Sequence, residues 1–431
     1  MSGDFYFCSM MMPDLLSYFL ENPVVTTDSR SITPGCIFFA LKGGNFNGND
    51  FLQQALDQGA GRVVGDEDRG ITDDRCILVQ DALEALQQLA KSYRLTWRCP
   101  VLAITGSNGK TTTKELIRDV LSTKFKVHAT KGNLNNHIGI PLTILTAPKD
   151  VELAIIEMGA NHQREIASYC QYVLPTHGVI TNIGKAHLEG FGGQEGVKKG
   201  KKELFTYLHE NSGEIFANVH LPFMSEVTQG MRIHALGEDM KLHVEDRTSG
   251  MEIRLVMPQK VLNFSTQLTG TYNLHNILTA MELGRYFEVD LEQAALAIER
   301  YVPENMRSQW KETERNQLII DAYNANPTSL EHALNHLSTI KDRSTLAIVG
   351  EMREMGEYSK QEHERIVQLI QDLNVSAILV GVEFEPWGAL YPYFQSVEDL
   401  NIWLKNHPIS DKTILIKGSR GIQLERVIPN L

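Results

Sequence analysis

Cysteine is scarce in this 431-residue chain, which contains five cysteines and no C-x-x-C pair. Their spacing provides no structural zinc motif and no disulfide framework, so we expect a reduced, cytoplasmic setting. The five positions are Cys8, Cys36, Cys76, Cys99 and Cys170.

Long apolar runs are also missing. No stretch approaches the roughly 20 apolar residues that a membrane-spanning helix needs, and there is no repeat or low-complexity tract. The N-terminal segment MSGDFYFCSMMMPDLL has no basic part followed by an apolar core, so it does not predict a secretion signal. We therefore expect no membrane partner.

The chain lacks an excess of positive charge, since its formal net charge is −12. This balance argues against a general nucleic-acid binder and against binding to an anionic membrane surface. Any anionic ligand must then be held by local groups. The candidate cations are Lys42, Lys110, Lys201 and Lys417.

The composition is that of an ordinary globular protein, with 42% hydrophobic and 22% charged residues. From Val101 onward, apolar strand-like segments alternate with helical segments, and the same alternation returns from Gln309. Such alternation predicts α/β domains with parallel sheets whose loops gather at the carboxyl ends of the strands. We expect three domains, at 1–83, 84–308 and 309–431.

The segment ITGSNGKTTT at 104–113 is the most informative feature. It follows the apolar segment VLAIT and precedes KELIRDVL, which has helical periodicity, so a glycine turn leads into a helix N-terminus that can bind phosphate. Ile104 stands where the general P-loop pattern has its first glycine, and a chance glycine turn is the alternative. Lys110 can reach the terminal phosphates and the Thr111 hydroxyl can ligate Mg²⁺. The candidate nucleotide-binding residues of this loop are Gly106, Ser107, Asn108, Gly109, Lys110, Thr111 and Thr112.

Two further loops follow strand-like segments. AIIEMGANHQREI at 154–166 places Glu157 after a strand, where its carboxylate could hold Mg²⁺ or could simply cap or pair within the loop. NIGKAHLEGFG at 182–192 places His187 in a glycine-rich loop, either as a ligand or as a hydrogen-bonded loop histidine.

The basic run KKGKKELF at 198–205 could be a solvated helix face or an anion-binding patch. A free ammonium group would be repelled by Mg²⁺, whereas a carbamylated lysine would carry a carboxylate able to coordinate a second metal ion. The sequence alone does not distinguish these alternatives.

Asparagine-rich and cationic loops complete the set of motifs. KGNLNNHIGIP at 131–141 and GTYNLHN at 270–276 could supply amide groups to a polar substrate or to adenine, or could serve only as turns and caps. In DAYNANPTS at 321–329, Asp321 could accept from a ribose hydroxyl or lie in an ordinary strand-to-helix loop. KGSRG at 417–421 suits a carboxylate or phosphate, or a solvated loop.

Taken in order, these segments resemble the Mur ligases of peptidoglycan synthesis. The resemblance covers nearly the full length and rests on TGSNGKTTTKE, KGNLNNHIGIP, IEMGANHQREI, AHLEGFG, K-x-x-L-F, N-L-H-N, DAYNANPTS and KGSRG. TTDSRSITPGCIFFALKG and GNDF resemble the UDP-sugar-binding segment of the family. The D-N-P-R tetrapeptide, typical of the member that adds the third residue, is not present, which favours the dipeptide-adding member.

The resemblance implies a small UDP-binding domain, a central ATP-binding domain with a P-loop ATPase-type parallel sheet, and a C-terminal Rossmann-like domain. It implies a monomer that joins D-alanyl-D-alanine to UDP-N-acetylmuramoyl-tripeptide through an acyl phosphate, releasing ADP and phosphate. Another Mur-type or folylpolyglutamate-type amide ligase is the nearest alternative. A P-loop GTPase would require an N-K-x-D motif, which is not present, and a nucleotide-regulated binding protein would carry out no chemistry.

The resemblance also implies roles for individual residues. Lys110 would neutralise charge on the transferred phosphoryl group, Thr111 and Glu157 would hold one Mg²⁺, and His187 would hold a second together with a carbamylated Lys201. Contacts to adenine, ribose and phosphate would come from Asn273, Asn276, Arg307, Asp321 and Tyr323. Substrate contacts would come from Ser29 and Arg30 at the UDP end, Asn135 and Asn136 at the acceptor peptide, and Lys417, Ser419 and Arg420 at the dipeptide.

Overall fold

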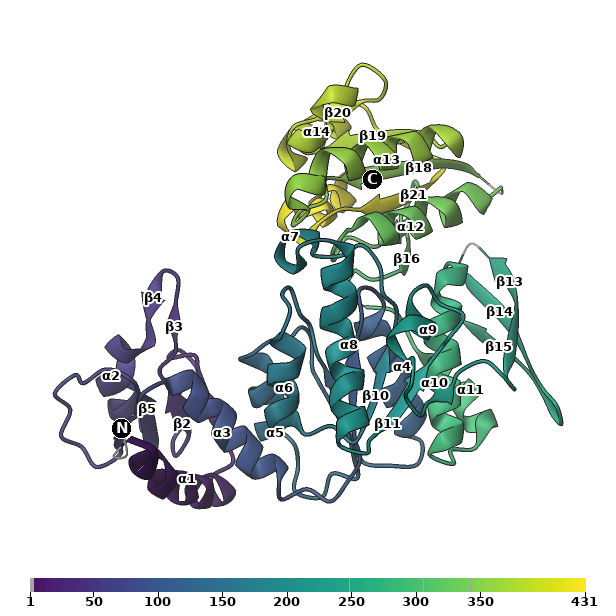
Figure 1. Ribbon diagram of the computed structural model, residues 1–431. Coiled ribbons are helices and arrows are strands. Elements are labelled where there is room, and N and C mark those ends of the chain that lie inside the picture. Colours follow the sequence, from purple (N-terminus) through teal and green to yellow (C-terminus); the bar gives the residue numbers. More distant parts are fainter. Residues whose placement is uncertain (1–3, 248, 305, 342) are drawn as a thin grey trace.

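The computed structural model describes residues 4–247, 249–304, 306–341 and 343–431. Figure 1 shows an N-terminal body beside the central one, and a C-terminal body stacked on the central one near α7 (Leu188–Phe191) and α12 (Pro327–Thr339). Each body is built around its own sheet, and the two large sheets are six-stranded.

The N-terminal body contains a sheet of four short parallel strands. The helices and strands of this body are α1 (Asp4–Glu21), β1 (Val25–Thr26), β2 (Ile37–Phe39), β3 (Lys42–Gly43), β4 (Phe46–Asn47), α2 (Leu52–Asp57), β5 (Arg62–Gly65) and β6 (Cys76–Leu78). The strand order is β1-β2-β5-β6, and β3 and β4 form a separate antiparallel hairpin. All three residues of β2 are buried, because Phe38 faces the apolar side chains of α2 while Ile37 and Phe39 face those of α1 and of the helix that follows the sheet, at 82–94.

Helix α3 (Ala82–Arg94) connects this body to the central one. The side chain of Asp81 caps its first turn by accepting from the Glu84 amide. Near its end, the Tyr93 hydroxyl donates to the Ala147 carbonyl at 2.8 Å and the Arg94 guanidinium donates to the Val173 carbonyl at 2.9 Å. These two bonds fix the helix against the central body.

The central sheet is parallel throughout. Its strands are β7 (Val101–Thr105), β8 (Val127–Ala129), β9 (Leu153–Glu157), β10 (His177–Ile180), β11 (Glu214–Ala217) and β12 (His234–Ala235). The order β12-β11-β10-β7-β9-β8 places β8 and β9 on one side of β7 and the later strands on the other. The crevice for a ligand in such a sheet lies where the winding direction reverses, which here is at the carboxyl end of β7.

Helices cover both faces of this sheet, which explains why every residue of β7 and β9 is buried. The remaining helices and strands of the central body are α4 (Lys110–Leu121), α5 (Gly139–Leu145), α6 (Glu165–Val173), α8 (Gln194–Glu210), α9 (Met224–Val227), β13 (Lys241–Arg247), β14 (Gly250–Met257), β15 (Lys260–Thr266), α10 (Leu274–Tyr286) and α11 (Leu291–Arg300). Strands β13, β14 and β15 form an antiparallel sheet that packs beside α11.

The C-terminal sheet also has helices on both faces (Figure 1). Its strand order is β16-β17-β21-β18-β19-β20. Besides α12, its elements are β16 (Gln309–Glu312), β17 (Gln317–Ile320), β18 (Ser344–Gly350), α13 (Ser359–Asp372), β19 (Ala377–Val380), β20 (Tyr393–Phe394), α14 (Val397–Asn406) and β21 (Lys412–Lys417). Only β16 runs antiparallel to its neighbour, while the other pairs are parallel as the alternating pattern predicts.

Two sequence-based expectations concern the molecule as a whole. Among the described residues, no helix combines the length and the apolar character needed to cross a bilayer. Cys36, Cys76, Cys99 and Cys170 are free thiols, and the side chain of Cys8 lies outside the described part of the chain.

Candidate functional site

A cavity of about 1040 Å³ opens between the central and C-terminal bodies, at the carboxyl ends of β7, β9 and β10. It brings together most of the residues that the sequence motifs single out. The residues concerned are Ser107, Asn108, Gly109, Lys110, Thr111, Thr112, Asn133, Asn135, Asn136, Glu157, His187, Asn273, Asn276, Arg307, Asp321, Tyr323 and Lys417.

The glycine loop connects β7 to α4 and requires glycine at two positions. Gly106 has φ +146°, and a Cβ atom there would lie 2.0 Å from the Thr181 hydroxyl oxygen. Gly109 has φ +77°, and a Cβ there would lie 2.7 Å from Asn276 Oδ1. Gly109 is followed by the first turn of α4, whose free amide groups and positive dipole end face the cavity.

Lys110 is held by the loop itself. Its ammonium group donates to the Gly106 carbonyl at 2.7 Å and to the Ser107 carbonyl at 3.3 Å. Burial lowers the pKa of Lys110 to about 8, with Glu157 opposing this shift and Arg307 adding to it. A bound polyphosphate would supply the negative counter-charge that the Lys110 ammonium does not receive from the loop carbonyls.

Glu157 is almost fully buried at the end of β9, with 1% of its surface exposed. Its Oε1 accepts from the Thr111 hydroxyl at 3.1 Å and from the Asn135 amide at 2.7 Å. Its Oε2 has no hydrogen-bond partner among the described residues, and the Lys114 ammonium lies 3.6 Å away. A buried carboxylate oxygen with a free lone pair beside a threonine hydroxyl fits a hard cation such as Mg²⁺.

The described part of the chain contains no cluster of three or more histidine, cysteine, aspartate and glutamate side chains that could hold a metal ion. A Mg²⁺ ion at Glu157 would therefore take its other oxygen ligands from Thr111, substrate phosphates and water, as Mg²⁺ commonly does.

His187 lies at the N-terminus of α7 with φ +53°. Its Nδ1 lies 2.6 Å from Oε2 of Glu354, a residue of the C-terminal body. This bond lowers the pKa of the Glu354 carboxyl group against the opposing effect of burial. The other ring nitrogen is thus the one that can serve a ligand.

Lys201 lies inside α8 with 1% of its surface exposed and does not line the cavity directly. Its ammonium group lies 3.4 Å from the Ala160 carbonyl oxygen and 5.0 Å from the centre of the Phe191 ring. Burial, reinforced by the charge of Lys110, lowers its pKa well below the usual value. An unmodified ammonium group does not fit a cation site here, whereas a carbamate would.

Asn273 and Asn276 form a buried amide ladder at the start of α10. The Asn276 amide donates to Asn273 Oδ1 at 2.8 Å, and the Thr113 hydroxyl donates to Asn276 Oδ1 at 2.9 Å. The Asn273 amide donates to the Thr269 carbonyl at 2.8 Å. The pair is therefore rigid, and both residues face the cavity.

The C-terminal body contributes Tyr323, Asp321 and Lys417, and the segment that leads into it contributes Arg307. The Arg307 guanidinium stacks over the Tyr323 ring at 3.6 Å from the ring centre, which presents a flat cationic surface to the cavity. The Lys417 ammonium donates to Asp321 Oδ2 at 2.6 Å and to the Asn324 carbonyl at 3.1 Å. Lys417 is 2% exposed, so in this arrangement it holds the Asp321 loop.

Besides Gly106 and Lys201, four candidate residues do not line the cavity. Ser419 is buried and accepts from the Arg353 amide at 2.8 Å, and Arg420 pairs with Glu425 at 3.0 Å. Ser29 and Arg30 lie in the N-terminal body, where Arg30 pairs with Asp28 at 2.7 Å.

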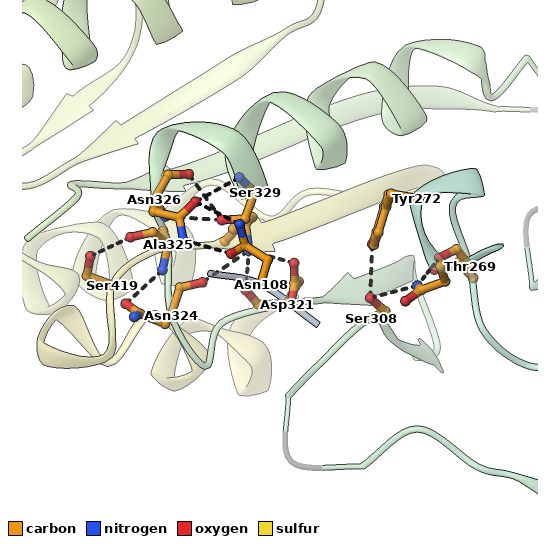
Figure 2. Close-up of polar contacts among 12 residues, drawn as sticks. Asn108, Thr269, Tyr272, Ser308, Asp321, Asn324, Ala325, Asn326, Ser329 and Ser419 are labelled. Atoms are coloured by element: carbon orange, nitrogen blue, oxygen red, sulfur yellow. Dashed lines mark hydrogen bonds and ion pairs between the residues drawn. The ribbon is translucent and has the colours of Figure 1, made fainter. Parts of the chain in front are cut away.

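Contacts between the bodies include residues that the motifs contain but that we had not singled out. The Asn326 amide donates to Asn108 Oδ1 at 2.7 Å, and Asn326 also caps α12 (Figure 2). Lys114, Glu354 and Glu362 were missed as well. Lys114 follows the glycine loop directly in T-T-T-K, but the sequence does not indicate that its side chain turns inward.

Comparisons with known proteins agree with this arrangement. The family profile described as "Mur ligase middle domain" matches residues 104–284, "Mur ligase, glutamate ligase domain" matches 306–420, and "Mur ligase family, catalytic domain" matches 23–94. A protein of Bacillus subtilis (strain 168) is 32% identical over 422 residues, covering 94% of this chain and 92% of its own length.

The chain belongs to the Mur ligase family.

Other members lie at similar distance. A protein of Escherichia coli (strain K12) is 33% identical, with 94% of this chain and 92% of its own length covered. Both curated relatives are named UDP-N-acetylmuramoyl-tripeptide–D-alanyl-D-alanine ligase.

Solved structures of Mur ligases share the fold. MurF of Acinetobacter baumannii aligns with a TM-score of 0.87 at 29% identity, over 94% of this chain and 92% of its own. MurF of Thermotoga maritima, solved in complex with ADP, aligns with a TM-score of 0.83 at 26% identity, over 94% and 96%. The three-domain α/β fold implied by the family resemblance is thereby confirmed.

Proposed function

We propose that this Mur ligase joins D-alanyl-D-alanine to UDP-N-acetylmuramoyl-tripeptide, with cleavage of ATP to ADP and phosphate. The observation that carries the proposal is full-length similarity to ligases named for this reaction, combined with a glycine loop that opens into a cavity between two bodies. The ADP-bound relative supports the assignment of the nucleotide.

The chemistry requires two anions to meet. The terminal carboxylate of the tripeptide attacks the γ-phosphorus of ATP, which forms an acyl phosphate and releases ADP. The amine of D-alanyl-D-alanine then attacks the acyl carbon, and phosphate leaves from the tetrahedral intermediate with loss of one proton. Phosphoryl transfer depends mainly on positioning and charge neutralisation, which suits a site built from Lys110, backbone amides and the N-terminus of α4.

Mg²⁺ is proposed at two positions, where it would neutralise phosphate charge. Thr111 and Oε2 of Glu157, which accepts no hydrogen bond from the described residues, would hold the first ion, and His187 with a carbamylated Lys201 would hold the second. Carbamylation needs a neutral amine, and the lowered pKa of Lys201 raises the neutral fraction at neutral pH.

The remaining residue assignments are proposals on the same basis. Asn273, Asn276, Arg307, Asp321 and Tyr323 would contact the nucleotide, since all of them line the cavity. The substrate residues would be Ser29 and Arg30 for the UDP end, Asn135 and Asn136 for the acceptor peptide, and Lys417, Ser419 and Arg420 for the dipeptide.

We also propose the limits 1–83, 84–308 and 309–431 for the three domains. The first limit falls within α3, which begins at Ala82, and the last coincides with the start of β16 at Gln309. A monomer in the cytoplasm is the proposed form and location of the enzyme.

A coupled ADP-release assay tests the function. Purified enzyme is supplied with ATP, Mg²⁺ and UDP-N-acetylmuramoyl-tripeptide carrying either lysine or diaminopimelate, and the amine donor is D-alanyl-D-alanine, a single amino acid, or none. We expect ADP release and a pentapeptide product by mass spectrometry only with the dipeptide. Product with single amino acids, or with folate and glutamate, would assign the chain to another amide ligase.

A further inference from the structure

The contact between His187 and Glu354 joins two separate bodies. His187 precedes α7 in the central body, whereas Glu354 lies in the loop after β18 of the C-terminal body, 167 positions later. Nδ1 and Oε2 are 2.6 Å apart, a short distance for a charge-assisted hydrogen bond. The side chain of His187 is 20% exposed and that of Glu354 is 50% exposed, so the contact lies at the edge of the cavity.

The partner of Nδ1 determines the chemistry of the ring. An ionised carboxylate only accepts hydrogen bonds, so Nδ1 must carry the proton. In the neutral ring the lone pair then belongs to Nε2, and the ring plane is fixed by the carboxylate. A metal-binding histidine is commonly oriented in this way by a carboxylate on its other nitrogen.

Glu354 is itself held in place for this contact. It has φ +63°, and its carbonyl accepts from the Glu189 amide of α7 at 3.2 Å. Close by, the Lys185 ammonium pairs with Glu362 of α13, and the Lys185 amide donates to the Thr328 hydroxyl of α12 at 3.0 Å. The loop 185–189 is thus bound to the C-terminal body at several points, all of which depend on the docking of the two bodies.

We propose that Glu354 is a positioning residue for His187, and that the cation site at His187 is completed only when the C-terminal domain docks. The inference rests on the proposed function, in which His187 is a ligand of the second Mg²⁺. It adds that the carboxylate which orients this ligand comes from the other side of the domain interface. Binding of the second cation and domain docking then favour each other, because the same contact serves both.

The test measures cation binding directly. Mn²⁺ replaces Mg²⁺, and free Mn²⁺ is followed by electron paramagnetic resonance in the presence of a non-hydrolysable ATP analogue. Wild type is compared with Glu354→Gln, Glu354→Ala and Glu357→Gln. Glu357 is the matched control, since it is an exposed carboxylate on the adjoining 3₁₀ turn Gly356–Tyr358 and forms no ion pair with the described residues.

We expect Glu354→Ala to weaken the weaker of two Mn²⁺ sites by about 10- to 100-fold. The stronger site, at Thr111 and Glu157, should be unchanged. Glu354→Gln keeps an acceptor oxygen and should show a smaller loss, and Glu357→Gln should match wild type. Small-angle scattering should show that added Mn²⁺ compacts the nucleotide-bound wild type more than Glu354→Ala.

Unchanged or tighter Mn²⁺ binding in Glu354→Ala would overturn the inference, as would a wild type that binds a single Mn²⁺. Thermal unfolding of each variant shows whether it is folded, and Glu354→Gln retains the shape of the side chain if the alanine variant is not. Ligase turnover of wild type is measured on the same preparation. Turnover with unaltered Mn²⁺ binding in the variant refutes this inference alone, whereas an inactive wild type refutes the proposed function.

Discussion

Two lysine side chains lie near the carboxylate of Glu157 at the base of the cavity, and a third, Lys201, is buried near Lys110, in a protein whose net charge is −12. Lys110 is bound to the carbonyls of the glycine loop, Lys114 is buried 3.6 Å from Glu157, and Lys201 is buried beneath Phe191. Burying cations is unfavourable unless negative charge is near. The local excess of positive charge therefore suits the site to a polyphosphate and an acyl phosphate.

Lys110→Met should lower kcat by about a thousandfold, because one preorganised charge on the transferred phosphoryl group is lost. The side chain is similar in length, so circular dichroism should report an unchanged fold. Lys199→Met is the control, since Lys199 is an exposed lysine of α8 that forms no ion pair with the described residues. Turnover close to wild type in Lys110→Met would contradict the role given to this lysine.

Lys201→Ala should abolish activity, and formate or acetate should restore part of it by supplying the missing carboxylate to the second cation. Lys202→Ala is the control, because it is the next lysine in the same run and is only partly buried. Intact-mass measurement under non-denaturing conditions should find about 44 Da added to wild type, because one CO₂ joins the lysine amine and the resulting carbamate carries a negative charge in place of the positive one. An active, metal-bound enzyme with unmodified Lys201 would refute the carbamate.

For single residues, the motifs predicted which side chains lie together at the cavity, but they did not predict the contacts that fix each side chain. Gly106 to Thr112, Glu157 and Asn273 could be identified from their order along the chain. Lys114 and Glu354 could not, because their contacts depend on the direction of a side chain and on the docking of two domains. The pairing of Lys417 with Asp321 joins residues 96 positions apart and is likewise invisible in either motif alone.

Strands with a neighbour on both sides are the elements that carry the site. β7, β9 and β17 could be predicted from apolar runs, because parallel strands covered on both faces are apolar at nearly every position. Short edge strands such as β12 and β20, with two residues each, leave no comparable pattern. The antiparallel direction of β16 follows from its tight connection to β17 and not from its composition.

The glycine loop is the element most sensitive to a single methyl group. Gly106→Ala should destabilise the protein by about 1–3 kcal/mol, because φ is +146° and the new Cβ would meet the Thr181 hydroxyl oxygen at 2.0 Å. Relief of that clash would displace the loop, so we also expect weaker binding of an ATP analogue by calorimetry. Gly44→Ala is the control, since a Cβ there meets nothing within 4 Å. Equal stability and affinity in both variants would contradict this account.

At the scale of the molecule, the cavity exists because the C-terminal domain is docked on the central one. The docking contacts include Asn108 with Asn326 and Lys185 with Glu362. Both contacts are polar, which suits an interface that opens and closes during turnover.

Lys185→Met should shift the domains toward an open arrangement, because it removes one side of an interdomain ion pair. We expect a several-fold higher KM for ATP, a smaller change in kcat, and a larger radius of gyration by small-angle scattering without nucleotide. Lys360→Met, at an exposed position of α13, is the control. A scattering profile of wild type that does not change on adding nucleotide would argue against closure.

Stability should fall in mild acid because histidines are buried in neutral form. Burial lowers the pKa of His177 from 6.5 to about 4, and it also lowers the pKa of His128 and His363. Between these values the unfolded chain binds more protons than the folded one, so the free energy of unfolding decreases as pH falls from 6.5 toward 4 and is level above about pH 7.

Urea unfolding at pH 7.5, 6 and 5 measures this loss, to which His177 should contribute on the order of 1–3 kcal/mol. His177→Gln should flatten the profile, while His209→Gln, at an exposed position, should leave it unchanged. A wild-type profile that is level down to pH 5 would show that these rings are protonated in the folded state.

Helix α3 packs against two domains at once. Its inner face packs on α1 and β2 of the first domain and on α5 and α6 of the second, and Tyr93 meets Phe19 edge to face at a ring distance of 5.0 Å. Cutting the chain on either side of this helix would expose an apolar surface on the fragment that lost it, and exposed apolar surfaces promote aggregation. The N-terminal domain is therefore a poor candidate for expression alone or for transfer to another ligase unless α3 and the surfaces of α5 and α6 that it packs on are transferred with it.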